Sequence, residues 1–404
     1  MPRWSPSRIA RRRNEVLQHS RGSMRPSLIA SRLGYSTRTV QRDLRALGHS
    51  RHSRVSDAVV ALIIVLQVLR RRRTFGVTAA VGMLRDYGIR VTRDRTRRIM
   101  RACGIQPPQR TSKRRMPWYE CDLPMRVLSI DQNEYLARYR VMSLSAIDAF
   151  SRECVHFDVV SNLTGPTHTK FYADTLRATG RLPDTTTADF AAQWRGAEYI
   201  VRCKHSGQNP SWNQNVGGVQ LRRAAWQQVP SFRNTPVERS HIELWQALYG
   251  LYCEFESLER RNLLHGGDRS DSLEIWCLHR AYWSKIRGAY AAFYSQRSKQ
   301  PKEKSTSNPN YPNGTYTRYE LYNSWQKAGH AITPAQISLW EAVGMSIWTA
   351  QSRAPRRHEC DPARTAAGKV LRRQLLHYGG CPQDCEGRYL KLRAASKIVQ
   401  LLGL

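Results

Sequence analysis

Apolar residues recur at helical spacing on both sides of Gly34, near the start of the chain. Ile29 and Leu33 precede the glycine, and Val40 and Leu44 follow it. This spacing predicts two short helices that bury their apolar faces against each other. The glycine between them has no side chain to hinder the positive φ that a tight turn needs. The pattern therefore predicts a helix-turn-helix.

The second of these helices carries polar and basic residues on the face opposite its apolar stripe. Their side chains donate hydrogen bonds of the kind that base edges and phosphates accept in a DNA major groove. Ser36 is suited to cap this helix at its N-terminus. We therefore predict a helix-turn-helix DNA-binding region over residues 1–55; the alternative is a helical hairpin with a solvated basic face. The DNA-binding candidates are Thr37, Arg38, Gln41, Arg42 and Arg45.

Residues 56–104 are predicted to form a second, small basic helical subdomain. The apolar run from Ala58 to Leu69 predicts a buried core helix, because it is shorter than the roughly 20 residues that cross a bilayer. Two further helical stripes lie on either side of Gly88. The last helix is rich in arginine, and Arg97 and Arg98 are further DNA-binding candidates. A solvated charged face is the alternative for this helix.

After a basic, proline-rich linker at 105–124, the pattern changes to β-branched and apolar runs. Three consecutive runs between 125 and 160 predict strands, and a helical segment follows at Thr167–Gly180. A short β-branched run then ends at Asp189, and a long helix begins near Pro236. The remaining predicted parts are an α/β core over 125–297, a flexible insertion over 298–316 and a C-terminal helical region over 317–404.

Three acidic residues occupy positions typical of a phosphoryl-transfer site. Asp131 lies within the first predicted strand, Asp189 just after a later strand, and Glu238 in the first turns of the long helix. Carboxylate oxygens are the ligands that hard divalent cations prefer, and two such ions side by side can activate an attacking oxygen and stabilise a leaving one. We therefore predict that the three acids converge on a two-metal site.

Each acid also has a structural alternative. Asp131 could accept hydrogen bonds from backbone donors, and Asp189 could cap a helix after its strand. Glu238 stands three residues after Thr235, the spacing of a capping box that needs no metal. Asp148 and Asp184 are rival carboxylates, but both are typical of turns.

The charge of the chain indicates a partner rich in phosphate. Its 404 residues include 65 Lys and Arg against 31 Asp and Glu, a formal net charge of +34. Residues 1–120 alone hold 28 of the basic residues and six of the acidic ones. A hydrophobic fraction of 41% excludes a disordered basic tail. Double-stranded DNA is the predicted partner, with no membrane partner expected.

The expected compartment is the nucleus. The basic run at 110–115 is either a nuclear-import patch or plain linker chemistry. No apolar stretch follows the charged residues at 1–13, so no secretory signal is expected. Nine scattered cysteines, an odd number, indicate a reducing compartment. Zinc is not expected, because one set of suitable residues lacks a standard spacing. That set is His358, Cys360, Cys381 and Cys385.

Four stretches carry a resemblance to a known family. They are the helix-turn-helix followed by TFGVTAAVGMLRDYGIRVTRDRTRRIMRACG, then LSIDQNEYLARYRVMSLSAIDAFSREC, LPDTTTADF and RNTPVERSHIELW. Over residues 26 to about 350, the chain resembles the eukaryotic integrase-core-domain proteins, relatives of retroviral and retrotransposon integrases. The resemblance implies an α/β, ribonuclease H-like fold: a mixed sheet flanked by helices, preceded by the all-α helix-turn-helix region and followed by a helical C-terminal part.

The resemblance also implies a D, D, E triad, which falls on Asp131, Asp189 and Glu238. In the family these acids bind two Mg²⁺ or Mn²⁺ ions; water is activated to nick a DNA end, and the freed 3′ hydroxyl attacks a target strand. Asn234, four residues before the Glu, also matches the motif. Family members act as multimers because two DNA ends are held together, so a homo-oligomer is expected.

Two departures from the family pattern bear on activity. The distance from Asp189 to Glu238 exceeds the usual spacing, which implies an insertion within residues 203–228. The Gly-Gly-Glu-Asn that usually follows the second Asp is replaced by Ala191-Ala192-Gln193-Trp194. We expect a mobile-element-derived DDE integrase that cleaves and joins DNA. The alternatives are a domesticated DNA-binding protein that retains the fold without catalysis, and a structure-specific nuclease on the same fold.

Overall fold

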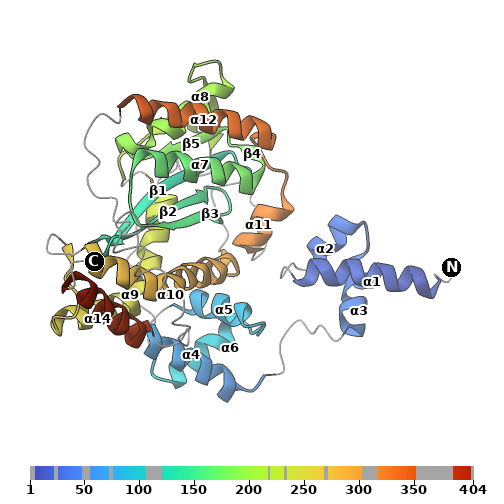
Figure 1. The fold of residues 1–404 in the computed structure, drawn as a ribbon. Coiled ribbons are helices and arrows are strands. Elements are labelled where there is room, and N and C mark those ends of the chain that lie inside the picture. The colour runs from blue at the N-terminus through green and yellow to red at the C-terminus, as the bar shows by residue number, and fades with distance from the viewer. Residues whose placement is uncertain are drawn as a thin grey trace.

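A computed structural model describes most of the chain (Figure 1). The described residues are 5–21, 26–47, 55–71, 76–105, 121–216, 219–231, 234–267, 272–302, 316–351 and 385–401. The predicted linker at 105–124 and insertion at 298–316 are therefore described only at their ends. Of the residues considered for zinc, only Cys385 is described. Within these ranges, no helix combines the length and apolar character needed to cross a membrane.

Three helices form a small N-terminal unit: α1 (Pro6–Arg21), α2 (Pro26–Leu33) and α3 (Thr37–Ala46). The two helices predicted around Gly34 are present, and the glycine has a φ of +68°. The Ser36 side chain caps α3 by accepting a hydrogen bond from the Thr39 amide at 3.1 Å. The Arg12 guanidinium of α1 donates two hydrogen bonds, of 2.6 and 2.9 Å, to the buried carboxylate of Asp43 on α3. This buried pair links α1 to α3.

Helices α4 (Asp57–Arg71), α5 (Val77–Asp86) and α6 (Arg93–Ala102) share a second apolar core. The α4 prediction needs a correction: Val60 and Ile64 are buried, but the opposite face is exposed. Only one face of this apolar helix is therefore buried in the core. This unit packs on the rest of the molecule through α4, which contacts α9 (Thr235–Arg260), and through α5, which contacts α10 (Ser272–Ser298). On α5, Gly82 lies so close to the backbone of Gln296 that a Cβ would overlap it. The exposed residues of α4 are Val59, Leu62, Leu66 and Leu69.

A five-stranded mixed sheet, in the order β3-β2-β1-β5-β8, forms the centre of the molecule. The first three strands form an antiparallel meander, and β5 and β8 join parallel to β1 and β5, respectively. This arrangement confirms the predicted mixed sheet of the α/β fold. The strands are β1 (Val127–Leu136), β2 (Val141–Asp148), β3 (Cys154–Val160), β5 (Thr185–Ala188) and β8 (Trp226–Gln228).

Helices cover both faces of the sheet (Figure 1). One face packs against α7 (Gly165–Thr179), α8 (Arg195–Lys204) and α12 (Pro334–Gln351), and the other against α9 (Thr235–Arg260) and α10 (Ser272–Ser298). Along β1 the side chains alternate: Leu128 and Ile130 enter the core beneath α7. The residues between them therefore point to the α9 face.

The chain between β5 and α9 differs from the sequence prediction. Residues 205–228 have no strong apolar alternation, yet they contain a two-stranded hairpin of β6 (Ser211–Val216) and β7 (Val219–Ala224), followed by β8. The hairpin lies inside the segment where an insertion was implied. In the chain, β8 follows this hairpin and is the last strand before α9. The added residues therefore precede the edge strand of the sheet and do not separate it from the long helix in sequence.

The remaining elements complete the helical C-terminal part. Cys385, at the start of α14 (Cys385–Leu401), is buried in the core shared by α9 and α10. The smaller elements are η2 (Ala137–Tyr139), β4 (Arg181–Leu182), η3 (Ala192–Trp194), β9 (Pro301–Lys302), β10 (Tyr316–Thr317), α11 (Arg318–Ser324) and β11 (His330–Ala331).

Candidate active site

Asp131 stands on the α9 face of β1, at the centre of the sheet. Its side chain is buried, with 4% of the residue exposed. Within the described part of the chain, the carboxylate accepts only one hydrogen bond, from the amide of the next residue, Gln132, at 2.9 Å. A single local donor leaves most of the acceptor capacity of a buried carboxylate unused. Satisfaction by backbone donors therefore does not explain why this Asp is buried.

Asp189 follows β5 directly, at the level of Asp131. Strand β5 pairs in parallel with β1, with Ser129 opposite Thr187. Continuing this register by two residues brings Asp189 beside Asp131. The Asp189 carboxylate accepts hydrogen bonds from the Trp194 indole at 2.9 Å and from the Ala191 amide at 3.3 Å. No side chain caps η3, so the helix-cap alternative for Asp189 is wrong.

Glu238 lies in the first turn of α9, and Asn234 fixes that end of the helix. Asn234 is fully buried; its amide nitrogen donates to the Ile130 carbonyl of β1 at 2.9 Å. The Thr187 hydroxyl of β5 donates to its side-chain oxygen at 3.5 Å. One side chain therefore ties the glutamate-bearing helix to both aspartate-bearing strands. The capping-box alternative for Glu238 is wrong, because Asn234 rather than Thr235 is the N-cap and no side-chain bond caps the helix.

The three carboxylates affect one another's ionisation. Burial, followed by the charges of Asp189 and Glu238, raises the pKa of Asp131 to about 8. Burial and the charge of Asp189 also raise the pKa of Glu238. Such shifts arise where like charges lie near one another in a partly dry site. Of the three predicted acids, Asp131 and Glu238 have ligand atoms within 4.8 Å of each other, and Asp189 lies near enough for its charge to act on both.

A histidine that the sequence analysis missed completes the cluster. His241, on α9, is 4% exposed and lies one turn after Glu238. Its Nδ1 is 4.0 Å from an Asp131 oxygen, and its Nε2 is 3.1 Å from the Ser145 hydroxyl of β2. Burial, with the nearby charge of Arg297, lowers the pKa of His241 to about 3, so the imidazole is neutral.

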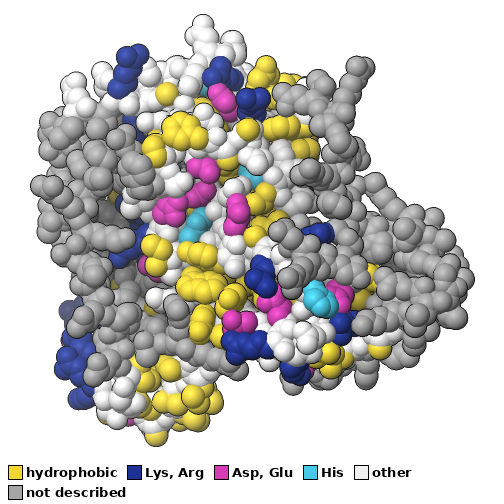
Figure 2. All heavy atoms as spheres, turned by 90° about the vertical axis from the view of Figure 1, so that its left-hand side faces the viewer, with side chains coloured by type: hydrophobic (Ala, Val, Ile, Leu, Met, Phe, Trp, Pro, Cys, Tyr) yellow, Lys and Arg dark blue, Asp and Glu magenta, His cyan; other side chains and the backbone are white. Residues whose placement is uncertain are grey.

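These side chains could hold a metal ion. One ligand atom from each of Asp131, Glu238 and His241 lies within 4.8 Å of the others. Two carboxylates and a neutral imidazole form a donor set that suits a divalent cation. On the face drawn in Figure 2, acidic side chains gather next to histidine side chains near the middle of the view.

A family comparison adds to this geometry. A family model described as an integrase core domain matches residues 118–329, more than half of the chain. The chain belongs to the integrase core domain family. The matched span contains the sheet, the three acids and His241. A search of curated proteins found no match.

The altered segment after the second Asp of this integrase core is an ordered part of the site. Trp194 is fully buried, and its indole donates to Asp189. Its ring meets the His168 ring edge to face, with centroids 4.4 Å apart. His168 in turn lies 2.9 Å from the side-chain oxygen of Gln132, the residue after Asp131. Through Trp194 and His168, the altered segment thus links Asp189 to Gln132 of β1.

The rival carboxylates of the integrase core are structural. Asp148 is fully buried and accepts three hydrogen bonds: from the Met125 amide at 2.7 Å, the Ser151 amide at 2.7 Å and the Ser151 hydroxyl at 2.6 Å. Asp184 is partly buried, with Arg126 at 3.9 Å. Neither belongs to the acidic cluster, as their turn-like sequence context predicted.

The DNA-binding candidates lie on helices outside the integrase core's acidic cluster. On α3 the five predicted side chains are all exposed, whereas Val40 and Leu44 of the same helix are buried. On α6, Arg98 is exposed, whereas Arg97 forms an ion pair of 2.8 Å with Asp94. Except for the ion-paired Arg97, the DNA-binding candidates are thus exposed on the surfaces of α3 and α6.

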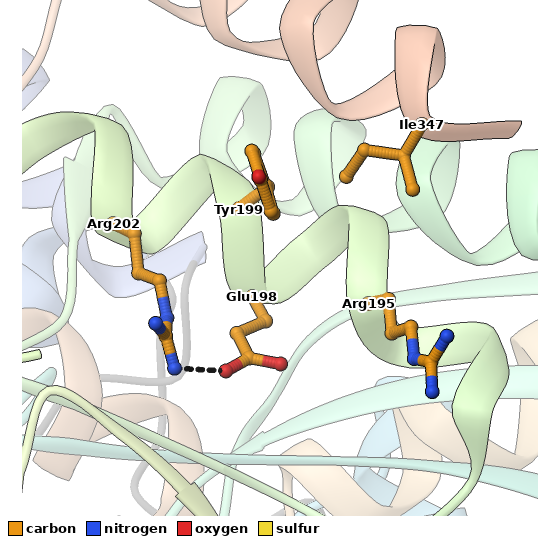
Figure 3. A pocket seen from close by; sticks show the side chains of 5 residues that line it. All are labelled: Arg195, Glu198, Tyr199, Arg202 and Ile347. Carbon is orange, nitrogen blue, oxygen red and sulfur yellow. Dashed lines mark hydrogen bonds and ion pairs between the residues drawn. The ribbon is translucent and has the colours of Figure 1, made fainter. Parts of the chain in front are cut away.

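A shallow cavity of about 340 Å³ lies between α8 and α12, away from the acidic residues (Figure 3). Arg202 and Glu198 form a hydrogen bond along α8. The lining residues include none of the three acids, so the cavity does not mark the catalytic position. They are Arg195, Glu198, Tyr199, Arg202 and Ile347.

Proposed function

We propose that this protein is a DDE integrase of mobile-element origin, which cleaves a DNA strand and joins its 3′ end to a target strand. The observation that carries the proposal is the convergence of Asp131, Asp189 and Glu238. They come from two parallel strands and one helix, and Asn234 links all three elements. Electrostatic repulsion within such a cluster is relieved by cations, and the family provides the reaction class.

Asp131, Asp189 and Glu238 would together hold two divalent cations, Mg²⁺ or Mn²⁺. When bound, such a pair lowers the pKa of an attacking water or hydroxyl and offsets charge on the leaving oxygen. The protein's own contribution is to fix its carboxylates. Asp131 is held by the centre of the sheet, Asp189 by Trp194, and Glu238 by the anchored end of α9. This rigidity keeps the acids in place without reorganisation during the reaction.

Double-stranded DNA is the proposed substrate. The net charge of +34 and the exposed basic face of α3 support it, because arginine and glutamine suit phosphates and base edges. We propose that the protein acts in the nucleus, where a DNA substrate is available, and microscopy of the tagged full-length chain tests this location.

We also propose that the active form is a homo-oligomer. Val59, Leu62, Leu66 and Leu69 form an exposed stripe on α4, spaced by three, four and three residues. This is the a/d spacing by which two helices pack against each other. Light scattering of the full-length chain should show a dimer or larger, and Leu62→Glu with Leu66→Glu should yield a smaller species. An unchanged mass in the double variant would contradict a role for this stripe.

The proposed reaction is tested with labelled duplex DNA ends and a target duplex, in Mg²⁺ or Mn²⁺. The expected products are a nicked strand and a new covalent joint, both abolished by Asp189→Asn. Arg287→Ala is a matched control on α10, since it changes an exposed arginine outside the acidic cluster. Cleavage without joining would indicate a nuclease. Salt-sensitive binding without either product, on varied ends, would indicate a DNA-binding protein that retains only the fold.

A further inference from the structure

His241 is a buried side chain whose position is unexplained by packing alone. It sits on α9 between the sheet and the helix layer, 4% exposed, one turn from Glu238. One ring nitrogen is engaged with Ser145 on β2, and the other points toward Asp131. A buried imidazole nitrogen directed at a carboxylate cluster is a candidate ligand rather than a core group.

We propose that His241 is a direct ligand of one catalytic cation, together with Asp131 and Glu238, and that it makes this position prefer Mn²⁺ to Mg²⁺. The proposal rests on the function proposed above, in that the acids bind divalent cations. It adds a fourth residue to the three acids and a chemical basis for choosing the ion.

The distances fit ligation better than a direct Asp–His hydrogen bond. The Nδ1 of His241 lies 4.0 Å from the Asp131 oxygen. That separation exceeds the roughly 2.7–3.2 Å of a hydrogen bond. Two ligands that each lie about 2.1 Å from one ion are separated by roughly 3 to 4 Å. The described geometry therefore leaves space for an ion between the two atoms.

Ser145 acts as the partner that orients the ring. Its hydroxyl lies 3.1 Å from Nε2, and Ser145 is the residue opposite Asp131 in the antiparallel pairing of β1 with β2. Metal-binding histidines commonly use their second nitrogen in such a bond, which fixes the tautomer and the ring orientation. Here the bond leaves Nδ1 facing the carboxylates.

The donor set determines which ion is favoured. Mg²⁺ binds oxygen ligands in a strict octahedron and retains several waters. An imidazole nitrogen binds the first-row transition metals better than it binds Mg²⁺, and Mn²⁺ is the weakest binder among those metals. Replacing an oxygen ligand by nitrogen at one of two positions should therefore favour Mn²⁺ there, while the other position keeps carboxylate oxygens only.

Pulsed electron paramagnetic resonance of Mn²⁺ bound to the full-length protein tests the proposal. We expect a coupling from one directly bound ¹⁴N nucleus, which changes to a ¹⁵N coupling when only histidine is ¹⁵N-labelled. His241→Asn, which places an amide oxygen near the Nδ1 position, should lose the coupling. It should weaken Mn²⁺ binding at least about tenfold, the range seen for groups that support metal sites, with a smaller effect on Mg²⁺.

His279→Asn is the matched control, because His279 lies on α10 and contacts the Tyr139 carbonyl rather than the acids. Its nitrogen coupling should equal that of the wild type. If wild-type protein binds Mn²⁺ without nitrogen coupling while DNA joining persists, His241 is not a ligand, but the proposed function stands. If wild-type protein binds no divalent cation and joins no DNA, both proposals fail. The labelling experiment remains informative if His241→Asn does not fold.

Discussion

Replacing Asp131 by Asn should stabilise the metal-free protein. The side chain is buried, accepts a hydrogen bond from the Gln132 amide, and is exposed to the charges of Asp189 and Glu238. In the folded state at neutral pH, these surroundings oppose its ionisation, whereas the unfolded chain ionises it freely. Asn has nearly the same shape and carries no charge. The substitution removes this penalty and should raise the free energy of unfolding.

The magnitude follows from the pKa of Asp131, which the fold raises from 3.8 to about 8. A pH of 7 lies about 3 units above the ordinary pKa of the unfolded carboxyl and below its pKa in the folded protein, and each unit is worth about 1.4 kcal/mol. The upper bound is therefore about 4 kcal/mol. Because the Asn amide is itself a buried polar group, we expect a gain of about 1–3 kcal/mol. For domains of this size, each kcal/mol raises Tm by about 2–4 °C.

Asp148→Asn is a control with the same chemical change and the opposite expected sign. Asp148 is also buried on the sheet, but both of its oxygens accept hydrogen bonds, from Met125 and Ser151. An Asn amide would turn its NH₂ group toward at least one of these donors. Hydrogen bonds to a charged group contribute about 1.5–3 kcal/mol each, so this variant should be less stable by a similar amount.

Thermal and urea unfolding in chelator at pH 7, followed by circular dichroism, would measure both variants. The two substitutions should move Tm in opposite directions. A loss of stability in Asp131→Asn, comparable to that of Asp148→Asn, would refute the reasoning. It would mean that Asp131 is satisfied by the fold and does not need a cation.

Three further predictions concern pH, the N-terminal unit and DNA. Because the pKa of Asp131 is raised from 3.8 to about 8, the stability of the metal-free protein should fall as the pH rises between these values. The affinity for Mn²⁺ should rise over the same range, because the ion binds the ionised carboxylate. Calorimetric titration with Mn²⁺ at pH 6 and pH 8 would measure this affinity, and equal affinities would contradict the prediction. Asp43→Ala removes the buried carboxylate that pairs with Arg12 and should destabilise α1–α3 by about 3–5 kcal/mol. Amide exchange should become faster in these helices and not in the sheet, and an equal change in both would contradict this prediction. Arg42→Ala should lower the slope of log affinity against log salt by about 1 if Arg42 contacts a phosphate, and an unchanged slope would count against that contact.

The sequence predicts the sheet and the acids because each has a local signal. Strands β1 to β3 carry apolar and β-branched runs, and Asp131 is conspicuous within the first of them. Glu238 follows a proline that marks the start of a helix. Local patterns could not show that the acids meet. That result depends on the parallel register of β1 with β5 and on the buried side chain of Asn234.

Strand β8, the hairpin before it and the role of His241 were missed because they depend on contacts with distant parts of the chain. The three residues of β8 form a strand through parallel pairing with β5, and the residues before it are too polar to predict a hairpin. His241 alone reads as an ordinary helix residue. Its spacing of three from Glu238 was the available signal, since residues three apart share a helix face. The exposure of Leu62 likewise depends on which side of α4 meets α5 and α6.

The most direct test of the central claim is a strand-joining assay that compares wild type with Glu238→Gln. Glu238 lies on the helix end that Asn234 anchors, so Gln keeps the shape while removing one metal-binding carboxylate. The assay follows a labelled 3′ end into a target duplex with Mn²⁺ present, at equal DNA binding for both proteins. We predict joining by the wild type alone, and none in chelator. Equal joining by Glu238→Gln, or joining without a divalent cation, would contradict the account.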